Sequence, residues 1–292
     1  MALAVAAAGG CAVSHKTAVK PAGAPVPLLT ATKQELVAKY NRQAEAVTSL
    51  NAAVKLLLTA GSSYTGVIEQ YHEVSGFILA QRPASIRVIG QAPVVGTNIF
   101  DMESDGQTFH IFIPSRHKFL IGPATIERPS AKPIENLRPQ HLTQAIFWEP
   151  VPSRAPVLIE EASEAASQYY VLTVARPLPA APPGADATAS ADWEIMSRIW
   201  FDRADLSVAR LETYDAGGKL GSDIRYSGWA RFGVAEYPRQ ISLARPGNDY
   251  RLDITITRLT LGEPIALDRF VLQQPPGTEL VRVGEEPEGT KP

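Results

Sequence analysis

The chain has 292 residues and a mass of 31.5 kDa, and its apolar fraction of 45% is ordinary for a globular protein. The formal net charge is -2, the isoelectric point is near 6.2, and the chain has no run of Lys and Arg. Its surface therefore has no strong positive potential to attract a polyanion, and we expect no nucleic-acid partner. The 24 prolines and 21 glycines are typical of many strands separated by turns. We therefore expect one large β domain.

The N-terminal residues resemble the end of a secretory signal. Residues 1–10, MALAVAAAGG, are apolar or small and stop directly before Cys11, the single cysteine of the chain. One cysteine excludes an internal disulfide and a multi-thiolate metal site. Because a charged first segment is missing, we interpret residues 1–10 as a signal-peptide remnant whose true start codon lies upstream. The alternative is a disordered N-terminus with an incidental cysteine. No other segment approaches the length of a transmembrane helix.

A tether and a helix are predicted next. Residues 11–31 are rich in Ala, Pro and Val and show no periodicity, which predicts a disordered tether. Thr32 and Glu35 have the spacing of a capping box and predict a helix that ends near Ser49. One face of this helix carries Leu36, Tyr40, Gln43 and Val47.

From residue 52 onward the apolar residues recur with a period of two, which predicts consecutive β-strands. Asp105-Gly106 and Gly217-Gly218 supply the residues of tight hairpins, so we expect an antiparallel order. The strands predicted in the second half of the chain span residues 157–162, 169–174, 194–201, 208–214, 223–229, 239–244 and 250–261.

Three segments interrupt or end the run of strands. Residues 136–148 predict a short helix whose apolar face carries Leu142, Ile146 and Phe147. Residues 176–192 form a proline- and alanine-rich segment, which we interpret as a flexible insertion between two strands; a domain boundary is the alternative. Residues 276–292 are predicted to form a loose tail.

These elements predict a mainly β fold with two helices over residues 32–275. An antiparallel sheet of about 11–12 strands must curl or split. We predict a single curved antiparallel sheet that forms a half-open barrel, with an N-terminal helix and a central lid helix. Sequence alone leaves open whether the concave face is filled by side chains or encloses a ligand cavity.

Between residues 32 and 148 the chain resembles the LolA/LolB family of periplasmic lipoprotein carriers. The order of elements is similar, and the local likeness rests on a strand with arginine and proline, a proline-containing turn, an Asp-Gly hairpin and an apolar triplet near the C-terminus. These motifs are Arg82-Pro83, Ile86-Arg87-Val88, Pro93-Val94-Val95-Gly96-Thr97, Asp105-Gly106, and Phe270-Val271-Leu272 before Pro275-Pro276-Gly277.

The resemblance implies a lipid anchor on Cys11, a location at the outer membrane facing the periplasm, and an apolar cavity for acyl chains. The implied ligands are lipidated proteins or free lipid, the implied partner is a soluble periplasmic carrier, and the receptor is expected to be a monomer. The apolar residues of the predicted strands and lid helix become candidate cavity residues: Val54, Leu56, Leu58, Phe77, Leu79, Ile86, Val88, Phe100, Met102, Phe109, Ile111, Leu142, Ile146 and Phe147.

The turn at Pro93 is the second place where the resemblance suggests a role. In the lipid-anchored member of the family this loop exposes an apolar side chain, and Val94 occupies the matching position. Val94 and Val95 are therefore candidates for contact with a lipid surface. The alternative is a tight hairpin whose valines pack back on the sheet.

Motifs for enzyme chemistry are weak. Ser115 and Lys118 have the spacing of some acyl-transferring hydrolases, but they follow a proline between two strands and read as a hairpin turn. The histidines lack the spacing of a metal site, although His72 and His110 on neighbouring strands leave a cross-sheet site open. We expect no metal, no cofactor and no enzyme activity.

The charged residues and tryptophans are predicted to play structural roles. We interpret Glu160, Glu161, Glu164, Asp202 and Asp205 as solvated strand ends, and the basic residues as a solvated face; these are Arg198, Arg203 and Arg210. Trp148, Trp193, Trp200 and Trp229 are expected mainly in the core. The predicted function is an acyl-binding lipid-anchored carrier or receptor. The alternative is a structural or sensing lipoprotein of the same fold that binds a protein partner.

Overall fold

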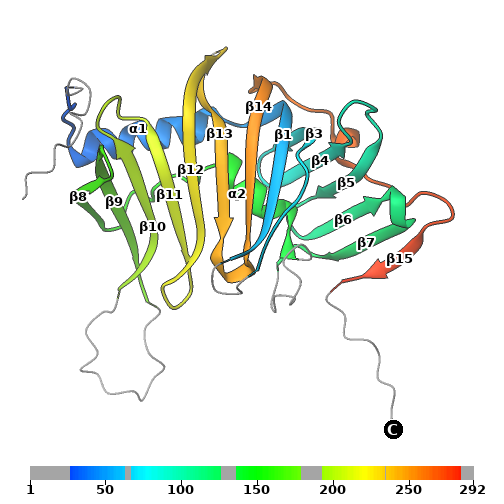
Figure 1. Ribbon diagram of the computed structural model, residues 1–292. Helices are drawn as coiled ribbons and strands as arrows, with labels where there is room; N and C mark the ends of the chain where they lie inside the picture. Colours follow the sequence, from blue (N-terminus) through cyan, green and yellow to red (C-terminus); the bar gives the residue numbers. More distant parts are fainter. Residues whose placement is uncertain (1–26, 63–66, 126–135, 179–192, 234, 284–292) are drawn as a thin grey trace, which may run out of the picture.

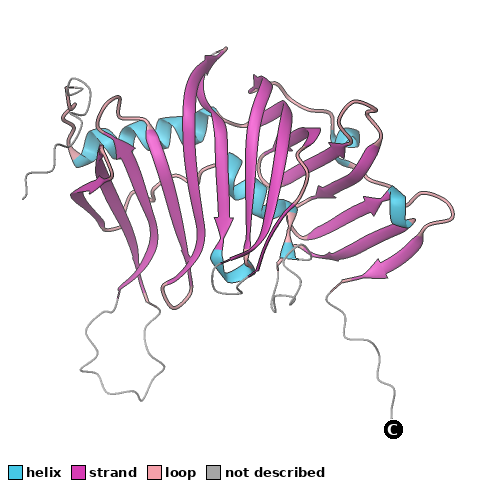
Figure 2. Ribbon diagram, viewed as in Figure 1, coloured by secondary structure: helices cyan, strands magenta, loops and turns pink. Residues whose placement is uncertain are grey.

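A computed structural model describes residues 27–62, 67–125, 136–178, 193–233 and 235–283, in which one long sheet curves around two helices (Figures 1 and 2). The helices are α1 (Lys33–Ala46) and α2 (Pro139–Ile146). The strands are β1 (Ser49–Ser62), β2 (Val67–Gln70), β3 (Val74–Gln81), β4 (Ser85–Gln91), β5 (Asn98–Ser104), β6 (Thr108–Ile113), β7 (Lys118–Pro123), β8 (Val157–Glu164), β9 (Ser167–Pro177), β10 (Trp193–Asp202), β11 (Val208–Asp215), β12 (Lys219–Phe232), β13 (Ala235–Arg245), β14 (Tyr250–Leu261) and β15 (Glu279–Arg282).

The sheet runs in the order β15-β7-β6-β5-β4-β3-β1-β14-β13-β12-β11-β10-β9-β8, with β2 attached to β1. Strand β1 lies at the centre because it pairs with β3 on one side and β14 on the other. Among the described residues β8 and β15 are the two ends and do not pair, so the sheet is unclosed. This confirms the predicted curved antiparallel sheet with two helices.

The prediction was wrong about the number of strands and about the tail. The sheet has fifteen strands rather than 11–12, partly because the short strands β2 and β15 carry too few residues to show a period of two. The segment predicted as a loose tail contains β15, which pairs in parallel with β7. The chain reaches that edge because Arg87 of β4 donates hydrogen bonds to the carbonyl oxygens of Arg269 (2.9 Å) and Val271 (3.3 Å).

Helix α1 begins where the sequence predicts it. The Thr32 hydroxyl accepts a hydrogen bond from the Glu35 amide, and the Glu35 carboxylate accepts one from the Thr32 amide, which completes the capping box. The helix ends at Ala46, three residues before the predicted end, because the chain must become extended to start β1 at Ser49. Its buried face carries Leu36, Tyr40 and Ala44.

Helix α2 is shorter than predicted and depends on the sheet for its position. Pro139 opens the helix, where its missing amide costs no intrahelical bond. At the other end the phenol of Tyr226 donates to the Ala145 carbonyl (3.0 Å) and that of Tyr237 donates to the Ile146 carbonyl (3.1 Å). Burial raises the pKa of both phenols, so they stay protonated and remain donors.

The two faces of the sheet differ in chemistry. Both helices lie across the concave face, which we call the inner face, and a single buried cluster joins them to apolar side chains of the strands from β1 to β14. The alternation is clear in β4, where Ile86 and Val88 are fully buried while the intervening residues are only half-buried. The opposite, outer face carries mostly polar and charged side chains.

A buried histidine lies in the first turn of α2. The His141 Nδ1 atom and the Tyr250 hydroxyl share a hydrogen bond, and both groups are buried. Burial, together with the positive charges of Arg245 and Arg138, lowers the pKa of His141 from 6.5 to about 3. The imidazole is therefore neutral in the folded protein at neutral pH.

We expect the free energy of unfolding to decrease as the pH falls from 6.5 towards about 3, because in this window the unfolded chain binds a proton at His141 that the folded chain excludes. The His141→Gln variant should show a weaker pH dependence in urea unfolding measured across this window. The exposed His72 provides the control, because His72→Gln should keep the wild-type dependence. If His141→Gln kept the pH dependence of the wild type, the attribution of this dependence to His141 would be contradicted.

Candidate ligand-binding face

Most of the predicted cavity residues lie on the inner face, but they are packed against one another and against the helices. Those that are buried are Val54, Leu56, Ile86, Val88, Met102, Phe109, Leu142, Ile146 and Phe147, and those that are partly buried are Leu58, Phe100 and Ile111. Phe109 packs under the guanidinium of Arg138, which lies 4.6 Å from the ring centroid. The inner face is therefore apolar and largely filled in this conformation.

Two predicted cavity residues lie elsewhere. In β3 the core positions are Ile78 and Ala80, so the alternating residues Phe77 and Leu79 point to the outer face. Phe77 is 44% exposed, whereas Leu79 is buried. The pattern in β3 is ambiguous because four apolar residues follow one another, and alternation alone cannot choose between its two faces.

A pocket of about 270 Å³ opens into the inner face between α1 and the nearby strand ends. We call it the aromatic pocket because Tyr40, Trp148 and Trp229 line it. The rings of Tyr40 and Trp148 are stacked with centroids 5.2 Å apart, and Trp229 meets Trp148 edge-on at 5.9 Å. The pocket borders the buried cluster, since Tyr40 and Trp148 belong to both.

The rim of the aromatic pocket consists of a few polar contacts between α1 and the sheet. Lys39 donates to the Asp205 carbonyl (3.4 Å), and Gln43 donates to the Glu236 carbonyl (2.6 Å). Both side chains also line the pocket. Exposed hydrogen bonds of this kind contribute little net stability, so α1 is held here mainly by its buried residues, Tyr40 among them.

Arg82 holds the ends of both helices, a role that the sequence prediction missed. Its guanidinium donates to the carbonyl oxygens of Ala44 (3.2 Å), Val47 (3.2 Å) and Trp148 (2.7 Å). It also lies over the Phe147 ring at 5.1 Å from the centroid. One side chain at the end of β3 therefore ties the C-terminal ends of α1 and α2 together.

The turn between β4 and β5 displays the two valines noted in the sequence. Val94 is fully exposed and Val95 is 71% exposed, so neither packs back on the sheet. The turn is closed by hydrogen bonds from the Ala92 amide to the Thr97 carbonyl (2.9 Å) and from the Gly96 amide to the Ala92 carbonyl (3.0 Å). Val94 has a φ of 74°, which is costly for a β-branched residue.

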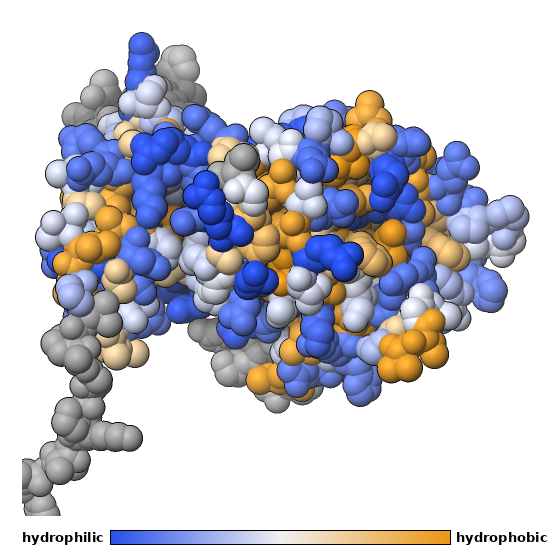
Figure 3. Space-filling view, turned by 90° about the horizontal axis from the view of Figure 1, so that it is seen from above, coloured by the Kyte–Doolittle hydropathy of each residue, from blue (hydrophilic) through white to orange (hydrophobic). Residues whose placement is uncertain are grey.

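The surface around these elements does not form one continuous apolar area. Seen from above, apolar residues are interspersed with polar ones (Figure 3). Trp193, which was expected in the core, is 54% exposed, whereas Trp148 and Trp200 are buried. A large apolar ligand would therefore need the inner face rather than the visible surface.

The motifs considered for chemistry form no reactive site. Pro114–Arg116 is a short 3-10 turn joining β6 to β7, with His117 in the left-handed conformation, so Ser115 and Lys118 belong to a hairpin. His110 pairs with Glu103 and stacks on Phe119. Burial raises the pKa of Glu103. Among the described residues no cluster of three potential ligands could hold a metal ion.

The interpretation of the outer charges as merely solvated was wrong. Arg198 and Arg210 are partly buried and lie within a chain of ion pairs that runs Glu160, Arg198, Glu212, Arg210, Asp223. Arg203 pairs with Glu161 (2.8 Å), and Arg225 pairs with Glu164 (3.4 Å). In these last two pairs the partners are far apart in sequence, so only the register of the strands brings them together.

Several of the predictions made from the sequence concern residues outside those that the structure describes. Cys11, residues 1–10 and most of the tether precede the first described residue, and most of the insertion at 176–192 lies in the gap between β9 and β10. Neither helix in the described part of the chain has the length and apolarity needed to cross a membrane.

The geometry defines a class of fold, a single unclosed sheet wrapped around two helices. Neither a protein-family model nor a curated protein matches the chain. Some solved structures are similar to it over most of its length. A LolA superfamily protein from Nitrosomonas europaea is 13% identical, with a TM-score of 0.46, and the match covers 83% of this chain and 99% of that one.

Two further structures are similar at the same level. A DUF1329 family protein from Desulfovibrio piger is 12% identical over 81% of this chain and 95% of that one, with a TM-score of 0.49. An outer membrane lipoprotein-sorting protein domain from Vibrio parahaemolyticus is 10% identical over 80% and 94%, with a TM-score of 0.44. The chain thus resembles LolA superfamily structures in fold, and its function is argued below from its own residues.

Replacing Arg82 tests how the helices are held. The Arg82→Met variant keeps the side-chain length but loses three hydrogen bonds to carbonyls, so we expect the free energy of unfolding to fall by about 2 to 4 kcal/mol. Hydrogen exchange should become faster in α2 and at the end of α1. Arg154→Met is the matched control, because Arg154 is exposed and no other described residue bonds to its side chain. Unchanged exchange in both helices would show that Arg82 does not hold them.

Proposed function

We propose that the protein is a carrier or receptor that binds acyl chains of lipoproteins or other lipids on the inner face of its sheet. The observation that carries this proposal is the continuous apolar cluster between the sheet and two helices, with the aromatic pocket opening into it. Binding of this kind needs no catalytic group, because it requires only the removal of apolar surface from water.

The free energy for binding would come from the burial of the acyl chain. Each methylene removed from water contributes about 0.8 kcal/mol, so a long acyl chain can offset the displacement of a short helix. Helix α2 has eight residues, fewer than an isolated helix needs in water, and it is held by two phenols and Arg82. It is therefore the element whose movement would open the inner face.

We also propose that the protein is located in the cell envelope. The sequence suggests an acyl anchor on Cys11, and the tether to residue 31 would let the domain reach away from the outer membrane on its periplasmic side. The exposed Val94 and Val95 would then touch a lipid surface, which would compensate for the strain of Val94. Lipidated proteins, free lipid or a soluble periplasmic carrier would be its partners.

One observation favours the alternative, a structural or sensing lipoprotein that binds a protein partner. The aromatic pocket of about 270 Å³ lies at the small end of ligand sites, and the rest of the inner face is filled by side chains. If the helices never leave the sheet, the fold serves only as a scaffold. Direct measurement of acyl binding separates the two functions.

The test uses the protein purified without detergent and a fluorescent derivative of palmitate. We expect saturable binding, and we expect a lipid-sized adduct in native mass spectra. Ser207→Trp, which fills the aromatic pocket, should weaken binding by about tenfold or more, corresponding to about 1.4 kcal/mol.

The control for this experiment is Ser163→Trp, which places the same side chain on the exposed part of β8. It should bind the probe as the wild type does. Absence of any adduct together with absence of probe binding would refute the carrier function and favour the structural alternative.

A further inference from the structure

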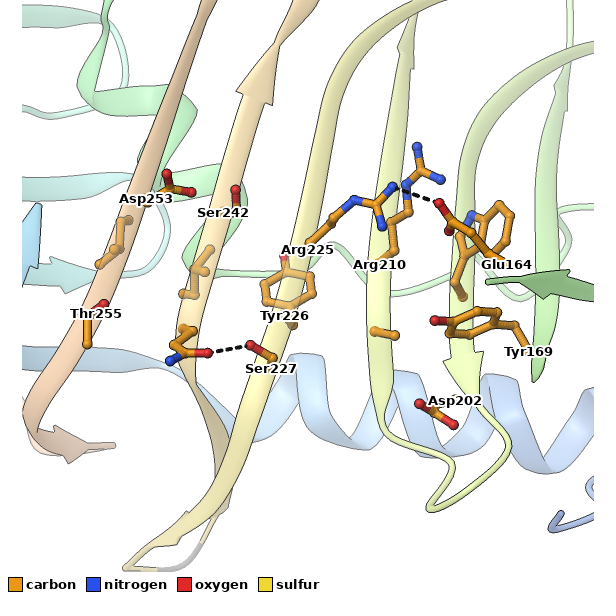
Figure 4. Close-up of a pocket in the computed structure, with 15 residues that line it drawn as sticks. Glu164, Tyr169, Asp202, Arg210, Arg225, Tyr226, Ser227, Ser242, Asp253 and Thr255 are labelled. Atoms are coloured by element: carbon orange, nitrogen blue, oxygen red, sulfur yellow. Dashed lines mark hydrogen bonds and ion pairs between the residues drawn. The ribbon is translucent and has the colours of Figure 1, made fainter. Parts of the chain in front are cut away.

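A second hollow lies on the outer face, on the opposite side of the sheet from both helices. It has a volume of about 540 Å³ and crosses the strands from β8 to β14. In Figure 4 its side chains stand in front of the strands, and helix α1 runs behind them. At about 4.8 Å between neighbouring strands, the hollow extends about 29 Å along the sheet. We call it the outer trough.

The strand register explains why a trough forms there. Arg210, Arg225, Ser242 and Asp253 lie side by side on β11, β12, β13 and β14. In the next row Gln240 separates Ser227 from Thr255. Small side chains thus occupy the middle of the face while arginine and aromatic side chains rise at one end, which leaves the hollow.

The end of the trough at β10 and β11 is a rigid wall. Arg210 donates to both carboxylate oxygens of Asp223 (2.6 and 2.8 Å) and pairs with Glu212 (2.9 Å). Trp200 donates to Glu212 (3.0 Å), and the guanidinium groups of Arg198 and Arg210 each lie 5.2 Å from its ring centroid. These groups satisfy one another, so they shape the trough and need no ligand.

The other end offers polar groups without partners inside the sheet. Among the described residues, the side chains of Ser242, Asp253 and Thr255 make no hydrogen bond or ion pair with each other or with neighbours. Gln240 accepts a hydrogen bond from Ser227 (2.7 Å) through its oxygen, which leaves its amide hydrogens available. This end therefore presents both donors and acceptors to whatever enters the trough.

The chemistry of the lining excludes three classes of ligand. An acyl chain would strand the carboxylates and hydroxyls that line the trough. A polyanion finds no excess of positive charge, because Arg210 and Arg225 face Glu164, Asp202 and Asp253. An extended peptide would leave its own backbone unpaired, because the strands in the middle of the sheet already use their backbone groups.

We infer that the outer trough binds a neutral oligosaccharide. Sugar hydroxyls donate and accept at once, so a ligand of this kind can be satisfied by side chains alone, as the lining requires. Asp253 would accept from hydroxyls, the Gln240 amide would donate to them, and Tyr169 at the wall would cover an apolar sugar face. The elongated shape fits several sugar units in line.

The experiment is titration calorimetry of the full chain with tetramers of glucose in α-1,4 linkage, glucose in β-1,4 linkage and N-acetylglucosamine. We expect saturable binding of at least one of them. Asp253→Ala should weaken that binding by about tenfold or more, because it removes a charged acceptor. Thr255→Trp should abolish it by filling the trough, and an aromatic residue is compatible with a strand.

Asp268→Ala is the matched control, because Asp268 is an exposed carboxylate in the segment after β14. It should bind the sugar as the wild type does, and circular dichroism should show that all three variants are folded. Absence of binding to all three tetramers would overturn the proposal. Binding that persists in Thr255→Trp would also overturn it, since the sugar would then occupy another place. These outcomes are independent of acyl binding, which concerns the opposite face.

Discussion

The burial of the inner face of the sheet by two helices is the constraint on which the rest of the structure depends. A sheet with free ends at β8 and β15 cannot bury its apolar face by closing on itself. Leu36 and Tyr40 of α1 and Leu142 and Ile146 of α2 join the strand residues in one cluster. At about 25 cal/mol per Å² of apolar surface, this contact is the main source of stability, and it also holds the curvature of the sheet.

The two helices are held in different ways, and this difference carries the functional argument. Helix α1 has fourteen residues, a complete capping box and a buried apolar face. Helix α2 has eight residues; its last two carbonyl groups accept from Tyr226 and Tyr237 of the sheet, and the Trp148 carbonyl just beyond it accepts from Arg82 in the turn after β3. A ligand that replaces the apolar contacts of α2 would have to break these hydrogen bonds and also those that join His141 to Tyr250 and Gln140 to Ser104 (2.6 Å). We propose that movement of this short helix exposes the inner face.

The sequence predicted the fold well where a local rule applied. Thr32 and Glu35 predicted the start of α1, and the period of two predicted most strands, because capping and alternation involve residues close together in the chain. The prediction from sequence failed where contacts between residues far apart in the chain determine the structure. The orientation of Phe77, the role of Arg82 and the ion pairs of Arg198 depend on strand register and on which segment covers which face. The outer trough, built from residues on seven strands, has no local signal at all.

The central claim is that an acyl chain binds on the inner face by displacing α2, and a crystal structure of the protein with palmitate tests it most directly. We predict the acyl chain between α2 and strands β12 and β13, with the hydrogen bonds from Tyr226 to Ala145 and from Tyr237 to Ile146 broken. A complex in which both hydrogen bonds are intact and the fatty acid lies outside the inner face would contradict the claim.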